Sequence, residues 1–100
     1  MKYQDRITKI GNLLKGLGVK CDIIQAGTYG IFISHDKDSS YYLNKILRDA
    51  AKKINQSLNE PAWVTSSKLS DNSKLFILSF IGEKQKFNVK QVIRDLRLQA

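Results

Sequence analysis

The stretch that decides the fold is Val19 to Ser34, VKCDIIQAGTYGIFIS, in which two apolar runs flank the glycine-containing segment AGTYG. In the first run apolar residues occupy every second position, the period that is typical of a half-buried strand. Residues 29–34 form a second run that is rich in strand-forming side chains. Because Gly27 and Gly30 can both supply the positive φ angles of tight hairpins, we expect a β-hairpin here.

A glycine-containing segment between apolar runs can also be a phosphate-binding loop. Such a loop needs more glycines, usually a Lys-Ser or Lys-Thr pair, and a helix that begins directly after it, so that the helix N-terminus faces the anion. Here a strand-like run follows the glycines instead. The pattern therefore favours a turn, and we expect no nucleotide cofactor.

Helices are expected on both sides of this hairpin. Apolar residues at three- and four-residue spacing predict a first helix over about residues 2–16. A longer helix begins near the N-cap candidates Asp38, Ser39 and Ser40 and ends before Pro61, which cannot continue a helix. Its predicted buried face is formed by Leu43, Ile46, Leu47, Ala50, Ile54 and Leu58.

The second half of the chain repeats the hairpin. Residues 62–69 (AWVTSSKL) and 75–81 (LFILSFI) are typical of strands and flank the polar turn SDNSK, and Asn88 can cap a last helix to about residue 98. The predicted class is α+β in the order α-ββ-α-ββ-α, with a four-stranded antiparallel sheet and packed helices in one domain, residues 1–100.

Two features of this second half bear on symmetry and assembly. The strings KILRDA (45–50) and QVIRDL (91–96) resemble each other, which suggests an internal ββα duplication. The last strand, residues 75–81, is apolar at consecutive positions and therefore on both faces, unlike a strand covered on one face only. Either helices cover both faces of the sheet, or the second face meets another chain in a homodimer.

The charge balance favours a negatively charged partner. Seventeen Lys and Arg stand against nine Asp and Glu, a formal net charge of +8 on 100 residues. Such a chain attracts nucleic acid or an acidic protein, although surface lysines can also serve solubility alone. The N-terminal residues have neither a signal-peptide core nor a membrane-spanning stretch, and the helices need their apolar stripes for the core. We therefore expect a cytoplasmic protein without a membrane partner.

The candidate binding residues lie on the two helices that follow the hairpins. On the long helix Tyr41, Lys45, Arg48 and Lys52 fall within about 60° of one another, opposite the buried stripe, with Asn55 beside the far end. Lys and Arg bind phosphate, whereas Tyr can stack on an unpaired base. A second basic group comprises Lys84, Lys86, Lys90, Arg94 and Arg97.

Either basic group alone can be an ordinary solvated helix surface, because exposed helix faces commonly carry Lys and Arg. Two groups of the same sign with few carboxylates favour binding. Lys68 and Lys74 flank the second turn, so that its tip could also enter a nucleic-acid groove as a wing.

Catalytic and metal-binding patterns are scarce. His35, Asp36 and Asp38 could bind a metal ion or support hydrolysis, but a metal site needs three or four converging ligands. Neighbouring positions at a strand-to-loop junction point in different directions, and Asp38 is better explained as a helix cap. The single Cys21 has no identifiable His partner and cannot form an intramolecular disulfide. We expect no enzyme, no metal and no cofactor.

The order of a helix, the hairpin GVKCDIIQAGTYGIFI (18–33) and a second helix resembles part of the double-wing DNA-binding domain of T4-type phage middle-promoter activators. The resemblance covers about residues 7–48. In that family paired hairpins project between helices and contact DNA. The resemblance implies phage origin and DNA binding, and it assigns no individual residue.

The leading prediction is a small basic non-enzymatic nucleic-acid-binding protein, such as a phage accessory or regulatory factor. The alternative is a protein-binding inhibitor or adaptor that docks an acidic host protein, for instance a toxin, a defence nuclease or RNA polymerase. In that case the apolar last strand and exposed aromatic side chains would form the interface. The sequence leaves open whether the nucleic acid is DNA or RNA, and whether it is single- or double-stranded.

Overall fold

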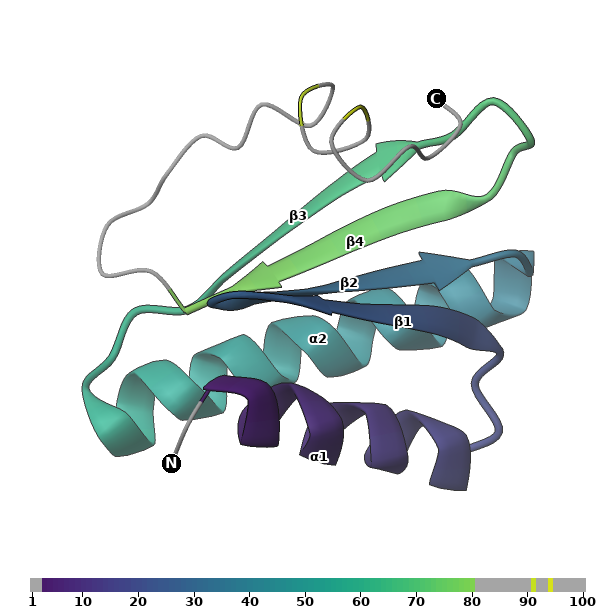
Figure 1. Cartoon of the computed structure of the whole chain (residues 1–100). Coiled ribbons are helices and arrows are strands. Elements are labelled where there is room, and N and C mark those ends of the chain that lie inside the picture. Colours follow the sequence, from purple (N-terminus) through teal and green to yellow (C-terminus); the bar gives the residue numbers. More distant parts are fainter. Residues whose placement is uncertain (1–2, 81–90, 92–93, 95–100) are drawn as a thin grey trace.

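Residues 3–80, 91 and 94 are described by a computed structural model of the chain (Figure 1). Residues 3–80 form two helices and one four-stranded sheet, in agreement with the predicted α+β class. The elements are α1 (Tyr3–Gly16), β1 (Cys21–Ala26), β2 (Tyr29–Ser34), α2 (Lys37–Leu58), β3 (Trp63–Lys68) and β4 (Lys74–Ser79). Of the predicted last helix, residues 91 and 94 are described and are helical, and the remainder lies outside the described residues.

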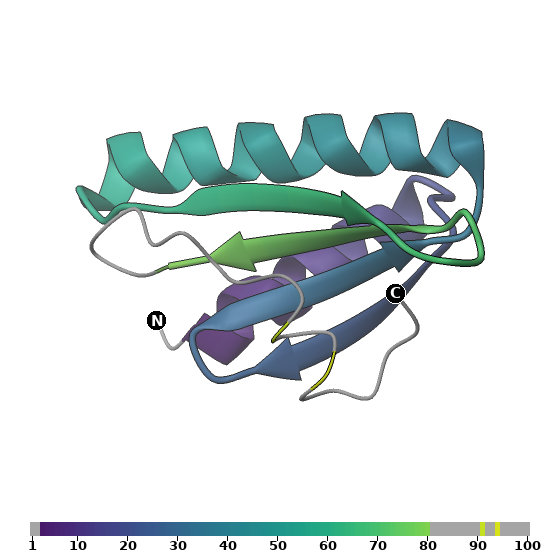
Figure 2. The same ribbon diagram turned by 90° about the horizontal axis from the view of Figure 1, so that it is seen from above.

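The sheet is antiparallel throughout and has the strand order β1-β2-β4-β3. The two hairpins therefore meet along their second strands, with β2 and β4 in the centre and β1 and β3 at the edges. Figures 1 and 2 show both helices on the same face of the sheet, α1 at the β1–β2 hairpin and α2 along the β3 side. Neither described helix is long and apolar enough to cross a lipid bilayer.

The turn between β1 and β2 confirms the predicted hairpin, but its two glycines act differently. Gly27 has a φ of 58° and occupies the first position of the two-residue loop, where a II′ turn requires a positive φ. The prediction for Gly30 was wrong, because its φ is not positive and it lies within β2. There a Cβ atom would come within 2.9 Å of Cγ2 of Ile7, so glycine permits the close packing of α1 on the sheet.

The start of α2 also differs from the prediction. Asp36 is the N-cap, and its Oδ1 accepts a hydrogen bond of 2.8 Å from the backbone N–H of Asp38. Asp38 and the two following serines therefore lie inside the helix. Ser34 Oγ donates to the backbone oxygen of Asp36 at 2.9 Å, which fixes the short connection between β2 and α2. The helix thus begins earlier than the cap residues suggested, and this shift brings Lys37 into its first turn.

The core between the helices and the sheet confirms most of the predicted buried face of α2. Leu43 and Leu47 are fully buried, and Ile46, Ala50 and Ile54 pack against the same cluster. Leu58 was predicted to share this face, but its side chain is 51% exposed. It is the last helical residue, and the chain reverses directly after it through Asn59, whose φ is 48°.

The second face of the sheet is also apolar and buried. Ile31, Ile33, Leu75 and Ile77 cluster with Leu69, whereas their neighbours in sequence point to the helix side. The predicted double-faced pattern of the last strand is therefore real. Because these side chains are buried within a single chain, their apolar character does not by itself require a second copy. A homodimer stays a prediction.

A polar network joins α1 to the connection between α2 and β3. Arg6 forms an ion pair with Glu60, and its guanidinium lies 5.5 Å from the ring centroid of Tyr3 and 5.6 Å from that of Phe80. The Tyr3 hydroxyl and the Arg6 guanidinium hydrogen-bond the carboxylate, so both lower the pKa of Glu60. These contacts hold the N-terminal helix to the far end of α2.

Candidate functional site

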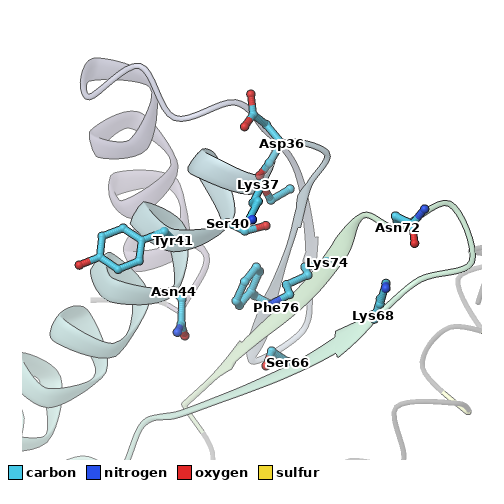
Figure 3. Close-up of a pocket in the computed structure, with 11 residues that line it drawn as sticks. Asp36, Lys37, Ser40, Tyr41, Asn44, Ser66, Lys68, Asn72, Lys74 and Phe76 are labelled. Carbon is cyan, nitrogen blue, oxygen red and sulfur yellow. The ribbon is translucent and has the colours of Figure 1, made fainter.

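A groove of about 590 Å³ lies between the first half of α2 and the β3–β4 hairpin. Figure 3 shows α2 as one wall and the hairpin as the other, with the Phe76 ring and the Lys74 side chain between them. Ser34 and Asp36, at the end of β2 and the start of α2, close one end. Residues from both halves of the chain therefore line one concave surface.

The helix wall is formed by Lys37, Ser40, Tyr41 and Asn44. These residues recur at three- and four-residue spacing, so they share one face of α2. In Figure 3 the Tyr41 ring projects outward at the rim, away from the hairpin. The wall thus offers one cation, two neutral polar groups and an accessible aromatic ring.

The hairpin wall is formed by Ser66, Lys68, Asn72 and Lys74. Lys68 and Lys74 are register partners in β3 and β4, so their side chains lie on the same face of the hairpin. Like charges that face each other across a sheet are unfavourable unless an anion lies between or beside them. The strand pairing therefore concentrates positive charge at this wall.

The turn of this hairpin is compact. The N–H of Leu69 donates to the oxygen of Ser73 at 2.8 Å, and Leu69 is buried in the second apolar cluster. Asp71 accepts hydrogen bonds from the hydroxyl and the backbone N–H of Ser73, and these bonds lower the pKa of Asp71. The Asp71 carboxylate is thus engaged within the turn.

The electrostatics of the groove are dominated by Lys37, Lys68 and Lys74, the groove lysines. All three are exposed, and none forms an ion pair with another residue that the structure describes. Asp36 is the carboxylate in the groove lining, and one of its oxygens caps α2. Three cations therefore face one partly engaged carboxylate, and the arrangement is suited to bind an anion.

The predicted row on α2 continues from this groove. Tyr41, Lys45, Arg48 and Lys52, the α2 row, are all exposed, and the Tyr41 side chain is exposed to 67%. Arg48 Nε donates to Asn44 Oδ1 at 3.1 Å, so the row and the helix wall are in direct contact. Tyr41 also packs edge-to-face on Tyr42, with ring centroids 5.5 Å apart and an interplanar angle of 77°.

Asn55, at the far end of the row, has a structural role. Its side chain accepts a 2.5 Å hydrogen bond from the N–H of Ala62 and donates to the oxygen of Ala62 at 3.4 Å. These bonds hold the connection to β3 against α2. Asn55 is therefore engaged in the scaffold.

The second predicted basic group is described at one position. Arg94 is helical and exposed. Lys84, Lys86, Lys90 and Arg97 lie outside the described residues.

Sequence reasoning missed Lys37 and Asn44, although both share the helix face of the α2 row. A helix start at Asp36 instead of Asp38 would have revealed Lys37, because the N-cap position determines which residues enter the first turn. Lys68 and Lys74 were noted only as flanks of a turn. Their approach to α2 depends on the pairing of β4 with β2, which no local pattern encodes.

The residues considered for metal binding do not converge. His35 Nε2 lies 2.9 Å from Oδ2 of Asp22, whereas Asp36 caps α2 and Asp38 lies in its first turn. Within residues 3–80, 91 and 94 there is no group of three or more His, Cys, Asp or Glu that could hold a metal ion. Burial raises the pKa of the Cys21 thiol, which makes it less reactive at neutral pH.

No protein-family model matches the chain, and no curated protein or solved structure matches it significantly. The resemblance to the double-wing domain stays a prediction, and the chemistry of the groove carries the functional argument.

Proposed function

We propose that this chain is a non-enzymatic nucleic-acid-binding protein that holds phosphates in the groove between α2 and the β3–β4 hairpin. The observation that carries the proposal is the convergence of the groove lysines, which come from separate elements and have no ion-pair partner among the described residues. Unpaired cations at a concave surface attract phosphate more strongly than cations scattered over a convex surface.

The length of the basic surface favours a polymeric anion over a small one. Lys37 and Lys52 are the first and last of a series of exposed cations along α2, about 22 Å apart at 1.5 Å per residue. Lys45 and Arg48 lie between them, so cations follow one another along the helix. A nucleic-acid backbone presents phosphates at regular intervals and can contact such a series simultaneously.

Fluorescence anisotropy with labelled single-stranded DNA, duplex DNA and RNA tests the proposal. If the groove lysines and the three cations of the α2 row each contact one phosphate, affinity between 50 and 200 mM salt should fall about 10³-fold for a duplex and about 300-fold for a single strand. Binding that does not depend on salt, or the absence of binding at low salt, would contradict the proposal.

Two glutamine variants locate the binding surface. The first replaces the groove lysines, and we expect it to reduce the slope of log affinity against log salt by about 2 to 3, because three counterion-releasing contacts are lost. The control removes the same charge from exposed helix positions outside the groove, namely Lys9, Lys15 and Lys53. Equal effects of the two variants would indicate a general charge effect and would refute this location.

The alternative prediction, docking of an acidic protein, receives less support. Its interface was expected on the apolar last strand, but the apolar side chains of β4 are buried. Tyr41 and Tyr42 are exposed and could serve either partner. A chain that binds an acidic protein but none of the three nucleic acids at low salt would favour this alternative.

A further inference from the structure

We infer that the groove receives single-stranded nucleic acid and that Tyr41 stacks on one of its bases, an inference that rests on the proposed function. Three properties of the described residues support it: the shape of the surface, the placement of the aromatic ring, and the neutral polar groups beside the lysines.

The shape of the surface suits a flexible strand. Proteins read a duplex by placing a protruding helix or ribbon in its major groove, which is about 12 Å wide. Here the first half of α2 is faced by the β3–β4 hairpin, so the helix face that carries Lys37 and Tyr41 is one wall of a groove instead of a ridge. At about 590 Å³ the groove has the size of ligand pockets, which span roughly 300 to 1,000 Å³.

Both hairpin loops are short. The loop between β1 and β2 consists of residues 27–28 alone. The loop between β3 and β4, residues 69–73, is closed by its own hydrogen bonds and anchored by the buried Leu69. Neither loop extends from the sheet as a long arm that could follow a duplex groove.

The aromatic ring is placed as single-strand binding requires. Tyr41 lies between Lys37 and Lys45 on the same helix face, so a cation flanks it on each side. An exposed fraction of 67% leaves the ring accessible to a base. A base can stack on this ring only when it is not already stacked within a duplex.

The remaining residues that line the groove also suit a single-stranded nucleic acid. Ser40, Asn44, Ser66 and Asn72 offer neutral donors and acceptors beside the groove lysines. Such groups can hydrogen-bond sugar hydroxyls or the edges of unpaired bases, while the lysines bind the phosphates. The expected ligand is thus a single strand whose backbone lies in the groove and one of whose bases covers the rim.

The test compares labelled strands of about 12 nucleotides, oligo(dT) and oligo(U), with a duplex of the same length, by fluorescence anisotropy at fixed salt. We expect the single strands to bind at least about tenfold more tightly than the duplex. Tyr41→Ala should weaken single-strand binding about 5- to 150-fold, because a base stack is lost. Tyr41→Phe keeps the ring and should stay within about threefold of the unmodified chain.

Tyr42→Ala is the matched control, because Tyr42 is also an exposed tyrosine but does not line the groove. We expect it to change affinity less than about threefold. Circular dichroism and thermal unfolding verify that the variants fold. We expect them to fold, because both tyrosine side chains are exposed.

The outcomes distinguish a failure of the single-strand inference from a failure of the proposed function. Tighter binding of the duplex, or equal losses of affinity in Tyr41→Ala and Tyr42→Ala, would overturn the single-strand inference. Salt-dependent binding in the same experiment would still support the proposed function. Absence of binding to every probe at low salt would overturn both. A loss confined to Tyr41→Ala, together with a preference for single strands, would establish the inference.

Discussion

Replacing Lys68 with glutamine is expected to stabilise the fold and to weaken nucleic-acid binding. Lys68 and Lys74 are register partners in β3 and β4, which places their Cβ atoms about 4.5 to 5.5 Å apart. Neither lysine forms an ion pair with a residue that the structure describes. Directly opposed like charges destabilise a sheet, so this pair favours an anionic ligand at the expense of the free fold.

The expected size of the stabilisation follows from the cross-strand pairing of Lys68 with Lys74. Cross-strand pairs contribute about 0.2 to 1 kcal/mol, so removal of one charge should raise the free energy of unfolding by about 0.5 kcal/mol. For a chain of this length that corresponds to a rise in Tm of about 2 to 4 °C. Both side chains are exposed, and the Debye length falls from about 30 Å at 0.01 M salt to about 3 Å at 1 M. The stabilisation should therefore disappear at high salt.

The assay is thermal unfolding followed by circular dichroism at low and high salt. Lys20→Gln is the control, because it removes one positive charge from an exposed position outside the strands. The double variant Lys68→Gln/Lys74→Gln isolates the pair: once Lys74 is neutral, the change at position 68 should match the control. A saturating oligonucleotide should reverse the order of stabilities, because ligand binding stabilises the unmodified chain more.

Two results would refute this reasoning. Lower stability of Lys68→Gln at low salt would mean that the lysine contributes favourably to the free fold. A stabilisation no larger than that of Lys20→Gln would mean that net charge, and not the cross-strand pair, is responsible.

Three further predictions concern the scaffold. Gly30→Ala should lower the free energy of unfolding by about 1 to 3 kcal/mol in urea denaturation, because its Cβ would overlap Ile7; an unchanged midpoint would contradict the close packing. Asn55→Ala should cost about 1 to 2 kcal/mol through its lost bonds to Ala62 yet leave oligonucleotide affinity unchanged in anisotropy titrations. Because the pKa of Glu60 is lowered in the folded chain, its contribution to stability is complete above about pH 4.3 and is lost as the pH falls below that value. Glu60→Gln should therefore reduce the dependence of the urea unfolding midpoint on pH between about pH 5 and 3.

Much of the fold could be read from local patterns. The spacing of apolar residues located both described helices and all four strands, and Gly27 marked the first hairpin. The errors arose where a residue type has two uses. Gly30 serves close packing instead of a positive φ, and Asp36 competes successfully with Asp38 for the cap because the hydrogen bond of Ser34 fixes its backbone.

The candidate site was predicted in part. The α2 row was accessible to sequence reasoning, because a helix places residues three and four apart on one face wherever the helix lies. The row was expected to be exposed because the opposite face of the helix carries Leu43 and Leu47, which are buried. The groove itself could not be predicted from the sequence, because one of its walls belongs to a hairpin from the other half of the chain.

The sequence by itself determined the α+β class, the two hairpins and a basic helix face, since these follow from the periods of 3.6 and 2 and from charge. Tertiary structure decided that β4 pairs with β2, and with it that Lys68 and Lys74 face Lys37 across a groove. The physical reason is that strand pairing between distant segments depends on burial of both sheet faces, a property of the whole chain. Local side-chain periodicity can place a charge on a surface, but only the packed sheet can oppose two such surfaces.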